Sequence, residues 1–295
     1  MKGTDDTSLL HDGRELVNSI AVFLFCRNNA SYIEKYLIHK LRIVESTYPQ
    51  THFTYYIFEN DSTDNTAAIL SDFLHENPRR RGCFMTKKMS LNDDQGGTTF
   101  SRIERIAFVR NCLLDEVREQ VTAVHQWCLF IDTNIFFDEL VLRQMFSYAP
   151  AANDIAMLTC NTIEVMHKDS VDGTEIDNTD VPYVTSYHYY DTFAFVDAQN
   201  RLLYPSCIHP QCHRLECFGA SAKHTWKDVM DVRSAWAGFV LIHASALKHP
   251  AVRWKPLQIM NENSICEHVY FCDMLQAINQ KRIVVLGDVH CYWLK

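Results

Sequence analysis

The run Trp127-Cys-Leu-Phe-Ile131 is apolar and ends abruptly in Asp132-Thr-Asn134. Five apolar residues followed at once by polar ones are typical of a central strand buried on both faces. Side chains two residues apart in extended chain point the same way, so Asp132 and Asn134 would face one ligand at the carboxyl end of the strand. Two oxygen donors there suit Mg²⁺ or Mn²⁺ carrying a diphosphate. A strand end with an ordinary polar turn accounts for this stretch alone equally well.

The rest of the chain alternates strand-like and helix-like segments. We expect strands at 19–25, 52–58, 83–85, 154–160, 239–243 and 282–286, and helices at 31–46, 65–75, from 101, at 138–147 and at 269–277. Short connections between such elements predict a parallel sheet with right-handed crossovers. We therefore expect an α/β fold with an open, mostly parallel, twisted sheet flanked by helices. The 295 residues fit a single domain, 1–295.

Polar side chains follow the first two expected strands. The first strand runs into Arg27 and Asn28, and the second into Glu59 and Asp61. Carboxylates accept hydrogen bonds from sugar hydroxyls, so acidic residues directly after a strand suit ribose and base recognition. These four residues are candidates for binding a nucleotide donor.

Three arginines mark the helix that begins near residue 101. Arg102 and Arg105 are three apart and share a face, and Arg110 follows in the same helix. Guanidinium groups near an Asp-x-Asn strand end suit a diphosphate. A solvated helix face is the alternative, and it is the more common case on periodicity alone.

The second half of the chain carries the remaining candidates. Asp191 lies in an aromatic-rich segment, which suits sugar recognition or a buried strand. Trp236 offers a stacking face, and Gly238 would let the backbone approach a substrate closely. Glu267 begins a helix, where a glutamate is also common for dipole and capping reasons. His290 follows the last expected strand and is a candidate metal ligand or phosphate partner.

Composition and missing motifs exclude several classes of protein. The net charge of −8 gives no electrostatic case for nucleic acid. No apolar run reaches the roughly 18–20 residues of a membrane span, and the polar N-terminus does not resemble a signal peptide. We therefore expect a cytoplasmic protein, or a Golgi-lumen protein if an anchor has been removed. Walker A, G-x-G-x-x-G and G-x-S-x-G motifs are absent. Cys207, Cys212 and Cys217 suit a loop of free thiols better than a zinc site or disulfide.

The order of these features resembles glycosyltransferases of the GT-A fold, most closely the fungal capsule-associated mannosyltransferase family. The resemblance spans about residues 19–293. It rests on five segments in order: the string 58–66 (Phe-Glu-Asn-Asp-Ser-Thr-Asp-Asn-Thr), 102–111, 130–137, 234–238 and 266–268. The first string and the ordered series are fairly specific, whereas each later segment alone is weak.

The resemblance implies transfer of a sugar from a nucleotide-diphosphate donor, GDP-mannose or a UDP-sugar, to a glycan or glycoprotein acceptor. Residues 1–150 would form the nucleotide-binding half and 151–295 the acceptor-side half. The residues carried over are Glu59 and Asp61 by the nucleoside, Arg102, Arg105 and Arg110 by the diphosphate, and Trp236, Gly238 and His268 on the acceptor side.

The resemblance also implies Mn²⁺ or Mg²⁺, with Asp132 and Asn134 in the Asp-x-Asp positions. Asn134 departs from that pattern, because an amide supplies oxygen but no charge. His290 would supply a further ligand. An inverting reaction needs a carboxylate base, for which Glu267 is the first candidate and Asp191 the second. An inactive nucleotide-sugar-binding protein and a metal-dependent nucleotidyltransferase are the alternative functions.

Overall fold

The computed structural model describes residues 18–88, 100–148, 154–165, 189, 191, 193–200, 229–258 and 264–294. The helical segments are α1 (Ala30–Tyr32), η1 (a π-helix, Ile33–Ile38), α2 (His39–Thr47), α3 (Thr66–Glu76), α4 (Phe100–Val124), α5 (Val141–Tyr148), η4 (a 3₁₀-helix, Ala244–Leu247) and α8 (Glu267–Asn279). The strands are β1 (Ser19–Cys26), β2 (His52–Asn60), β3 (Arg81–Lys87), β4 (Trp127–Asp132), β5 (Ile135–Phe137), β6 (Ile155–Val165), β7 (Val196–Asp197), β8 (Val229–Ser234), β9 (Phe239–His243), β10 (Leu257–Gln258), β11 (Ser264–Ile265) and β12 (Arg282–Leu294).

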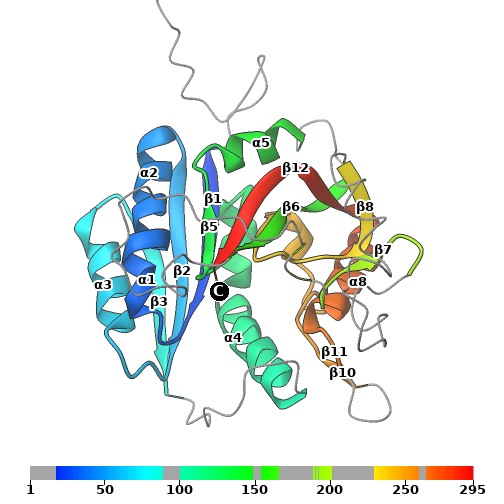
Figure 1. Ribbon diagram of the computed structural model, residues 1–295, viewed down its shortest axis with the longest axis horizontal. Coiled ribbons are helices and arrows are strands. Elements are labelled where there is room, and N and C mark those ends of the chain that lie inside the picture. The colour runs from blue at the N-terminus through cyan, green and yellow to red at the C-terminus, as the bar shows by residue number, and fades with distance from the viewer. Residues whose placement is uncertain are drawn as a thin grey trace, which may run out of the picture.

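One ten-stranded sheet runs through the molecule in the order β3-β2-β1-β4-β9-β6-β12-β8-β7, with β5 paired to β12 beside this path (Figure 1). The pairings β3-β2-β1-β4 and β6-β12 are parallel. Strands β9, β8 and β5 run the other way. The sheet is thus mixed, with most strands pointing in one direction, and the expected open α/β fold is confirmed.

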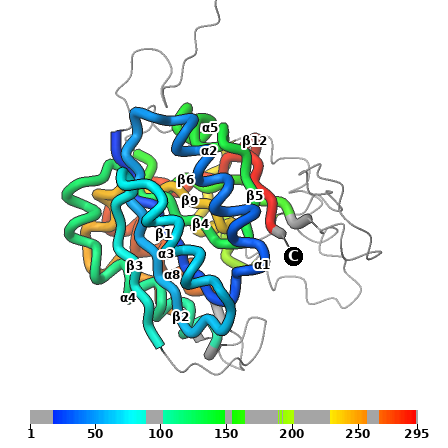
Figure 2. Tube along the Cα trace, turned by 90° about the vertical axis from the view of Figure 1, so that its left-hand side faces the viewer, coloured from blue at the N-terminus to red at the C-terminus, as the bar shows by residue number. Residues whose placement is uncertain are grey.

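Helices cover both faces of this sheet. Side chains of β1 alternate: Ala21 and Phe23 pack with α4 and α8, while Ile20, Val22 and Leu24 pack with η1, α2, α3 and α5. Figure 2 shows α1, α2 and α3 together in front of the first strands. A central strand buried on both sides must be apolar throughout, which is why its sequence reads as a continuous apolar run.

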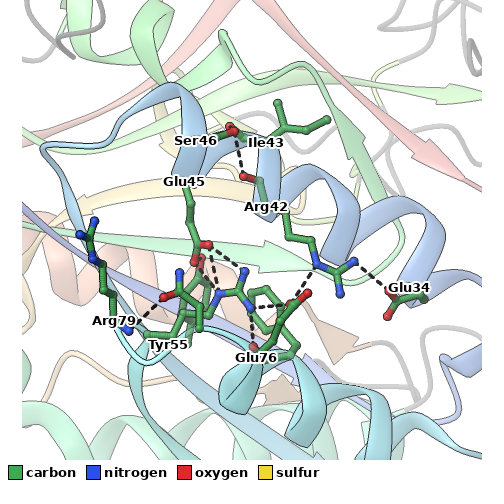
Figure 3. Close-up of polar contacts among 11 residues, drawn as sticks. Glu34, Arg42, Ile43, Glu45, Ser46, Tyr55, Glu76 and Arg79 are labelled. Atoms are coloured by element: carbon green, nitrogen blue, oxygen red, sulfur yellow. Dashed lines mark hydrogen bonds and ion pairs between the residues drawn. The ribbon is translucent and has the colours of Figure 1, made fainter.

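An ionic network centred on the buried side chain of Arg80 ties α2 and α3 to the edge of the sheet. Arg80 donates to Glu45 at 2.8 Å and to Glu76 at 2.8 Å, and its side chain is only 5% exposed. Glu45 also accepts the hydroxyl of Tyr55 from β2. Figure 3 shows these contacts and places Arg42 between Glu34 and Glu76. This network joins α2 and α3 to each other and to β2.

Two expected elements differ in the structure. The helix expected at 31–46 is helical throughout but contains the π-helix η1, whose wider turns are common near functional sites. The last strand does not end at residue 286, because β12 continues through a register shift to Leu294 and pairs with β5. Cys207, Cys212 and Cys217 lie outside the described residues. Among the residues that are described, no helix is long and apolar enough to cross a membrane.

The carboxyl ends of β1, β2 and β4 meet at one edge of the sheet. Phe25, near the end of β1, is level with Asp132 at the end of β4, and Cys26 is level with Glu59 of β2. Helix α4 connects two parallel strands, so its amino-terminal end returns to this same edge. In α/β sheets this carboxyl edge is where ligands bind.

Candidate active site

Asp132 and Asn134 lie in the tight turn between β4 and β5. Both side chains are half-buried, and the backbone N–H of Asp132 donates to the carbonyl of Gly238 at 2.8 Å. The next residue, Ile135, already pairs with Trp293 at the end of β12. The turn is thereby held on both sides, which leaves the two oxygen-bearing side chains at the carboxyl edge of the sheet.

A second turn, Ala237–Gly238, lies directly against the first. Both residues have positive φ, 60° for Ala237 and 73° for Gly238. Such backbone is rare for a residue with a Cβ and is concentrated at functional sites. A Cβ on Gly238 would lie 2.7 Å from Ile135 and 3.2 Å from Asp132 Oδ2. Gly238 therefore permits close approach to the Asp132 turn, rather than the close approach to substrate inferred from sequence.

The Ala237–Gly238 turn also holds Asp191. The backbone N–H of Ala237 donates to Asp191 Oδ2 at 3.2 Å, and the N–H of Ala194 donates to Oδ1 at 3.3 Å. Burial, and then the nearby carboxylates of Asp132 and Glu267, raise the pKa of Asp191 to about 7. One short turn thus joins Asp132 and Asp191, and it places a carboxyl group that titrates near neutrality beside the Asp-x-Asn turn.

Arg110 is the positive centre of this cluster. Its Nη1 donates to Glu267 Oε1 at 2.5 Å, and its Nη2 lies 3.5 Å from Asp132 Oδ1. The guanidinium also lies 5.4 Å from the Trp236 ring centroid. The residue is 7% exposed. Arg110 therefore contacts the protein's own carboxylates, and its expected place beside the diphosphate stays a prediction.

Glu267 begins α8 and is 4% exposed. Its Oε1 accepts from Arg110, and Cys266 Sγ lies 3.4 Å from its Oε2. Because both oxygens are engaged inside the protein, Glu267 is poorly placed to take a proton from an acceptor. The expected role of Glu267 as first-ranked base, with Asp191 second, stays a prediction.

Trp236 and His268, the residues expected on the acceptor side, are buried against each other. Their rings stack with centroids 4.1 Å apart, and the two residues are 1% and 4% exposed. Phe130, Trp254 and Phe271 pack edge-on against Trp236. Protein rings thus pack around Trp236, and its expected role as a sugar-stacking face stays a prediction. Burial and the Arg110 charge hold the pKa of His268 well below its usual range, so this histidine is neutral.

Trp254 is not among the site residues predicted from the sequence, because no periodic pattern marks the segment before it. Its indole Nε1 donates to His268 Nδ1 at 3.1 Å. Asn111, next to Arg110, holds the backbone of Trp254 by accepting its N–H at 2.9 Å and donating to its carbonyl at 2.7 Å. Ala237 was also missed, since alanine gives no signal for positive φ. Both residues act through contacts that only the folded chain creates.

The loops that follow β1 and β2 are bonded to each other. Asn28, with φ of 50°, accepts the N–H of Thr63 at 2.8 Å and donates its own N–H to Ser62 Oγ at 3.0 Å. Glu59 accepts the N–H of Ser62 at 2.9 Å, and Asp61 has φ of 53°. Together with half-buried Arg27, these residues form a rigid loop pair at the carboxyl edge.

Arg102 and Arg105 lie on the first turns of α4, at the same edge. Arg102 is exposed and Arg105 is half-buried. They lie about two turns and one and a half turns before Arg110. Both remain candidates for binding a diphosphate.

His290 does not lie just past a strand, because it is an exposed residue within β12 and pairs with Asn161. Trp293, three residues further, is the partner of Ile135. Three residues of extended chain span about 10 Å, so His290 is set back along the strand from the Asp132–Asn134 turn. The expected role of His290 as a further ligand beside Asn134 stays a prediction.

Two groups of described residues are candidate cation-binding sites. Cys266, Glu267 and His268 offer ligand atoms within 4.8 Å of one another, but the Arg110 guanidinium already occupies Glu267 and His268. A metal cation there would face a buried positive charge. Asp132 and Asn134 instead present half-exposed oxygens, with Asp191 and Glu267 nearby. The side-chain oxygens at the Asp132 turn are the ligand type that Mn²⁺ and Mg²⁺ prefer, and the carboxylates nearby outnumber the one positive charge of Arg110. These residues therefore fit Mn²⁺ or Mg²⁺.

Three solved structures are similar to this chain. Mannosyltransferase PcManGT from Pyrobaculum calidifontis, in complex with GDP-Man and Mn²⁺, has a TM-score of 0.50 and 12% identity over 92% of this chain and 56% of its own. S. aureus TarS 1–349 in complex with UDP has a TM-score of 0.48 and 14% identity over 94% of this chain and 60% of its own.

GalNAc-T7 with UDP, GalNAc and Mn²⁺ has a TM-score of 0.46 and 8% identity, over 95% of this chain and 44% of its own. The chain thus spans about half the length of these proteins. The likeness to PcManGT shows the fold, which is of the GT-A type.

A comparison with curated protein sequences finds no match. A family model does match, over residues 20–273, and its description is Cryptococcal mannosyltransferase 1. That range includes the strand ends that carry Asn28, Glu59 and Asp132, and it extends to Glu267 at the start of α8. Because the match covers most of the sequence, the chain belongs to this mannosyltransferase family.

Proposed function

We propose that the chain is a glycosyltransferase that moves a sugar from a nucleoside-diphosphate donor to a hydroxyl group of a glycan or glycoprotein acceptor. Family membership supports this reaction class. The observation that carries the proposal is that one turn, Ala237–Gly238, bonds both Asp132 and Asp191. It brings a cation-binding carboxylate and a carboxyl group with a pKa of about 7 to the same edge of the sheet.

The nucleoside would bind over the paired loops after β1 and β2. Arg27, Asn28, Glu59 and Asp61 lie there, and the bonds between Asn28 and Ser62–Thr63 hold the loops in one conformation. A preorganised loop pair binds with little ordering cost. GDP-mannose is the first choice of donor, since the family is one of mannosyltransferases and PcManGT was solved with GDP-Man and Mn²⁺. UDP-sugars are the alternative.

A divalent cation would be held by Asp132 and Asn134, together with oxygens of the donor diphosphate. When bound, it offsets the negative charge that develops on the leaving diphosphate. Arg102 and Arg105 would bind the same phosphates from the start of α4. Arg110 keeps Asp132 in place from the protein side.

In the reaction, the acceptor oxygen bonds to the anomeric carbon while the bond from that carbon to the diphosphate oxygen breaks. The nucleoside diphosphate leaves with the bonding electron pair. A single inverting displacement needs a protein base for the hydroxyl proton, whereas in a retaining reaction an oxygen of the leaving diphosphate takes that proton. Asp191 suits the inverting case, because a base titrating near neutral pH is ionised often enough to accept a proton and basic enough to hold it.

The experiment is a thermal-shift panel of GDP, UDP and CDP, each with and without Mn²⁺, on the wild type and Asp132→Asn. A ligand at about a hundredfold excess over its Kd stabilises the folded state by about 2.7 kcal/mol. We expect a Mn²⁺-dependent shift with one nucleotide in the wild type and none in Asp132→Asn. No shift with any nucleotide would rule the proposal out.

A turnover assay with sugar nucleotides separates an enzyme from an inactive binding protein, the alternative that the neutral Asn134 specifically favours. Donor hydrolysis or transfer, followed by release of the nucleoside diphosphate, is expected from GDP-mannose or a UDP-sugar in the presence of Mn²⁺. Binding without turnover on a panel of glycan acceptors would instead favour the binding protein. Arg80→Met, in the distant ionic network, is the control for general loss of stability.

A further inference from the structure

Asn29 follows the end of β1, and it is 7% exposed. Its side-chain Oδ1 accepts the backbone N–H of Arg27 at 2.9 Å and the hydroxyl of Thr133 at 3.2 Å. Its Nδ2 donates to the hydroxyl of Tyr32. Both polar atoms of this buried amide are thus bonded inside the protein, as a buried polar group requires.

The N–H of Arg27 fixes which way the Asn29 amide points. A backbone N–H is a donor only, so the atom that faces it must be the amide oxygen rather than the amide nitrogen. That oxygen is an acceptor only, so the Thr133 hydroxyl, which contacts the same oxygen, must be the donor. The direction of both hydrogen bonds therefore follows from groups whose protonation does not change.

Thr133 is the middle residue of the Asp132–Asn134 turn. Asp132 and Asn134 are half-buried, whereas Thr133 is only 8% exposed, so the threonine is the residue of this turn that lies within the protein. The residues on either side already hold the turn, because Asp132 bonds Gly238 and Ile135 pairs with β12. The Thr133 hydroxyl adds a third bond, which joins the turn to the loop after β1.

The backbone of Asn29 also joins the loop after β2. Its N–H donates to Thr66 Oγ1 at 2.7 Å, and Thr66 Oγ1 in turn donates to Asp64 Oδ1 at 2.6 Å. The N–H of Ala30 donates to Asp64 Oδ2 at 2.9 Å. Thr66 is 0% exposed, so its hydroxyl is shielded from water. Asn29 and its neighbours thus connect three segments that are far apart in the chain: 27–32, 64–66 and 132–134.

We infer that Asn29 is a positioning residue, which sets the Asp132–Asn134 turn against the paired loops after β1 and β2. Being buried, it acts through Thr133 on the turn and through Thr66 on the loops. The inference rests on the proposed function, in which the turn holds the cation and the loops hold the nucleoside. Because one donor has to reach both, their relative position sets how strongly cation and nucleotide favour each other's binding.

The test measures that coupling. The nucleotide is the one among GDP, UDP and CDP whose binding depends on Mn²⁺ in the thermal-shift panel. Its Kd is determined by titration calorimetry without Mn²⁺ and with saturating Mn²⁺, and the first value divided by the second is the coupling ratio. By linkage the same ratio describes the effect of the nucleotide on Mn²⁺ affinity. Global stability does not enter the ratio, because both values are measured on the folded protein well below its Tm.

A matched pair of variants at Thr133 tests the bond to the turn. Thr133→Val removes the hydroxyl and keeps the shape of the side chain, whereas Thr133→Ser keeps the hydroxyl. We expect the coupling ratio to fall by roughly tenfold in Thr133→Val, as for outer partners of metal ligands, and to stay near the wild-type value in Thr133→Ser. The Kd without Mn²⁺ should not change, because the loops remain bonded to each other. An unchanged ratio in Thr133→Val, or an equal fall in Thr133→Ser, would overturn the inference.

Asn29→Ala tests whether Thr133 acts through Asn29. This variant removes the side-chain acceptor and keeps the backbone bond to Thr66. We expect it to lower the coupling ratio, and the double variant Asn29→Ala/Thr133→Val to lower the ratio no further than Asn29→Ala alone. Losses that multiply in the double variant would show that the two residues act independently, which would overturn the link. The Thr133 pair decides the inference even where Asn29→Ala does not fold.

Two controls separate positioning from loss of core contacts. Tyr48→Phe removes the hydroxyl of a buried tyrosine, which donates to the carbonyl of Glu139 at 3.0 Å. Thr162→Val replaces a buried threonine whose hydroxyl has no hydrogen-bond partner among the described residues. Tyr48→Phe should lower the Tm, and both controls should leave the coupling ratio unchanged; an equal fall in either would overturn the inference. A wild type without Mn²⁺-dependent nucleotide binding would refute the proposed function and the inference with it, whereas a wild-type ratio that no variant changes refutes the inference alone.

Discussion

Arg110 and Glu267 are separated by 157 residues in the chain, yet Arg110 Nη1 lies 2.5 Å from Glu267 Oε1. Their side chains are 9% and 5% exposed, so the pair is largely withdrawn from water. Taking charges out of water costs several kcal/mol per ion, which the mutual attraction must offset. The pair joins α4 to α8 and sets the electrostatic environment of Asp132 and Asp191.

Removing one member of this pair should be more damaging than removing both charges together. We expect Arg110→Met to destabilise the fold by about 3–5 kcal/mol, because it leaves Glu267 charged and unpaired. Glu267→Gln should cost less, since Asp132 still faces Arg110. The double variant should lose less free energy of unfolding than the two single variants lose together. Urea unfolding of the four proteins measures this, and strictly additive losses would contradict the coupling.

The buried pair Arg80–Glu45 is the matched control for that cycle. Its partners are 2.8 Å apart and 5% and 16% exposed, but they lie in the network of α2 and α3 (Figure 3). Arg80→Met should also destabilise the fold. Because it is distant from Asp132, it should leave the affinity for Mn²⁺ and nucleotide unchanged, whereas Arg110→Met should lower both.

Asp191 should make the folded state less stable as pH rises. Its pKa is about 7 in the folded chain, against an ordinary value of 3.8 for an aspartate in the unfolded chain. Between these values the unfolded chain loses the proton while the folded chain keeps it, so stability falls with rising pH by up to about 1.4 kcal/mol per unit. Below 3.8 the contribution is fully present, and above 7 it is lost. Urea unfolding from pH 4 to 8 measures the slope.

The variant Asp191→Asn cannot ionise and should remove this slope while retaining nucleotide binding. If transfer is inverting, turnover in Asp191→Asn should fall by about 10²-fold or more, the range typical of losing a general base. An unchanged slope in Asp191→Asn would assign the pH dependence to another group.

Gly238→Ala should disturb the Asp132 turn. A Cβ there combines a φ of +73° with contacts of 2.7 and 2.8 Å to the Ile135 side chain. We expect a stability loss of about 1–3 kcal/mol and weaker Mn²⁺ binding. Ile135→Val alone should have little effect, but combined with Gly238→Ala it should recover part of both losses. No recovery would show that backbone strain, rather than the clash, dominates.

Asn134→Asp should create a full pair of carboxylates at the turn. Added negative charge strengthens binding of a hard cation, so Mn²⁺ affinity should rise by roughly tenfold. In the presence of EDTA the same change should lower the Tm, because the new charge lies near Asp132 without a counter-ion. Titration calorimetry and thermal unfolding check both effects. An unchanged Mn²⁺ affinity would argue against a ligand at position 134.

Several features of the site were readable in the sequence because they are local. The apolar run before Asp132 requires a buried strand, and polar residues after β1, β2 and β4 must gather where parallel strands end. These relations depend only on side-chain alternation and the direction of crossovers. They correctly placed Asn28, Glu59 and Asp132 at one edge of the sheet.

The division of roles within the cluster was decided by the tertiary structure. No local pattern indicates that Arg110 pairs with Glu267, that protein rings cover Trp236, or that β12 continues past His290. Nor does the sequence reveal that Ala237, at a positive φ, bonds Asp191 beside Asp132. Such contacts join residues far apart in the chain, and their burial sets which charges are paired. The sequence by itself determined which groups reach the site, whereas packing determined which remain available for chemistry.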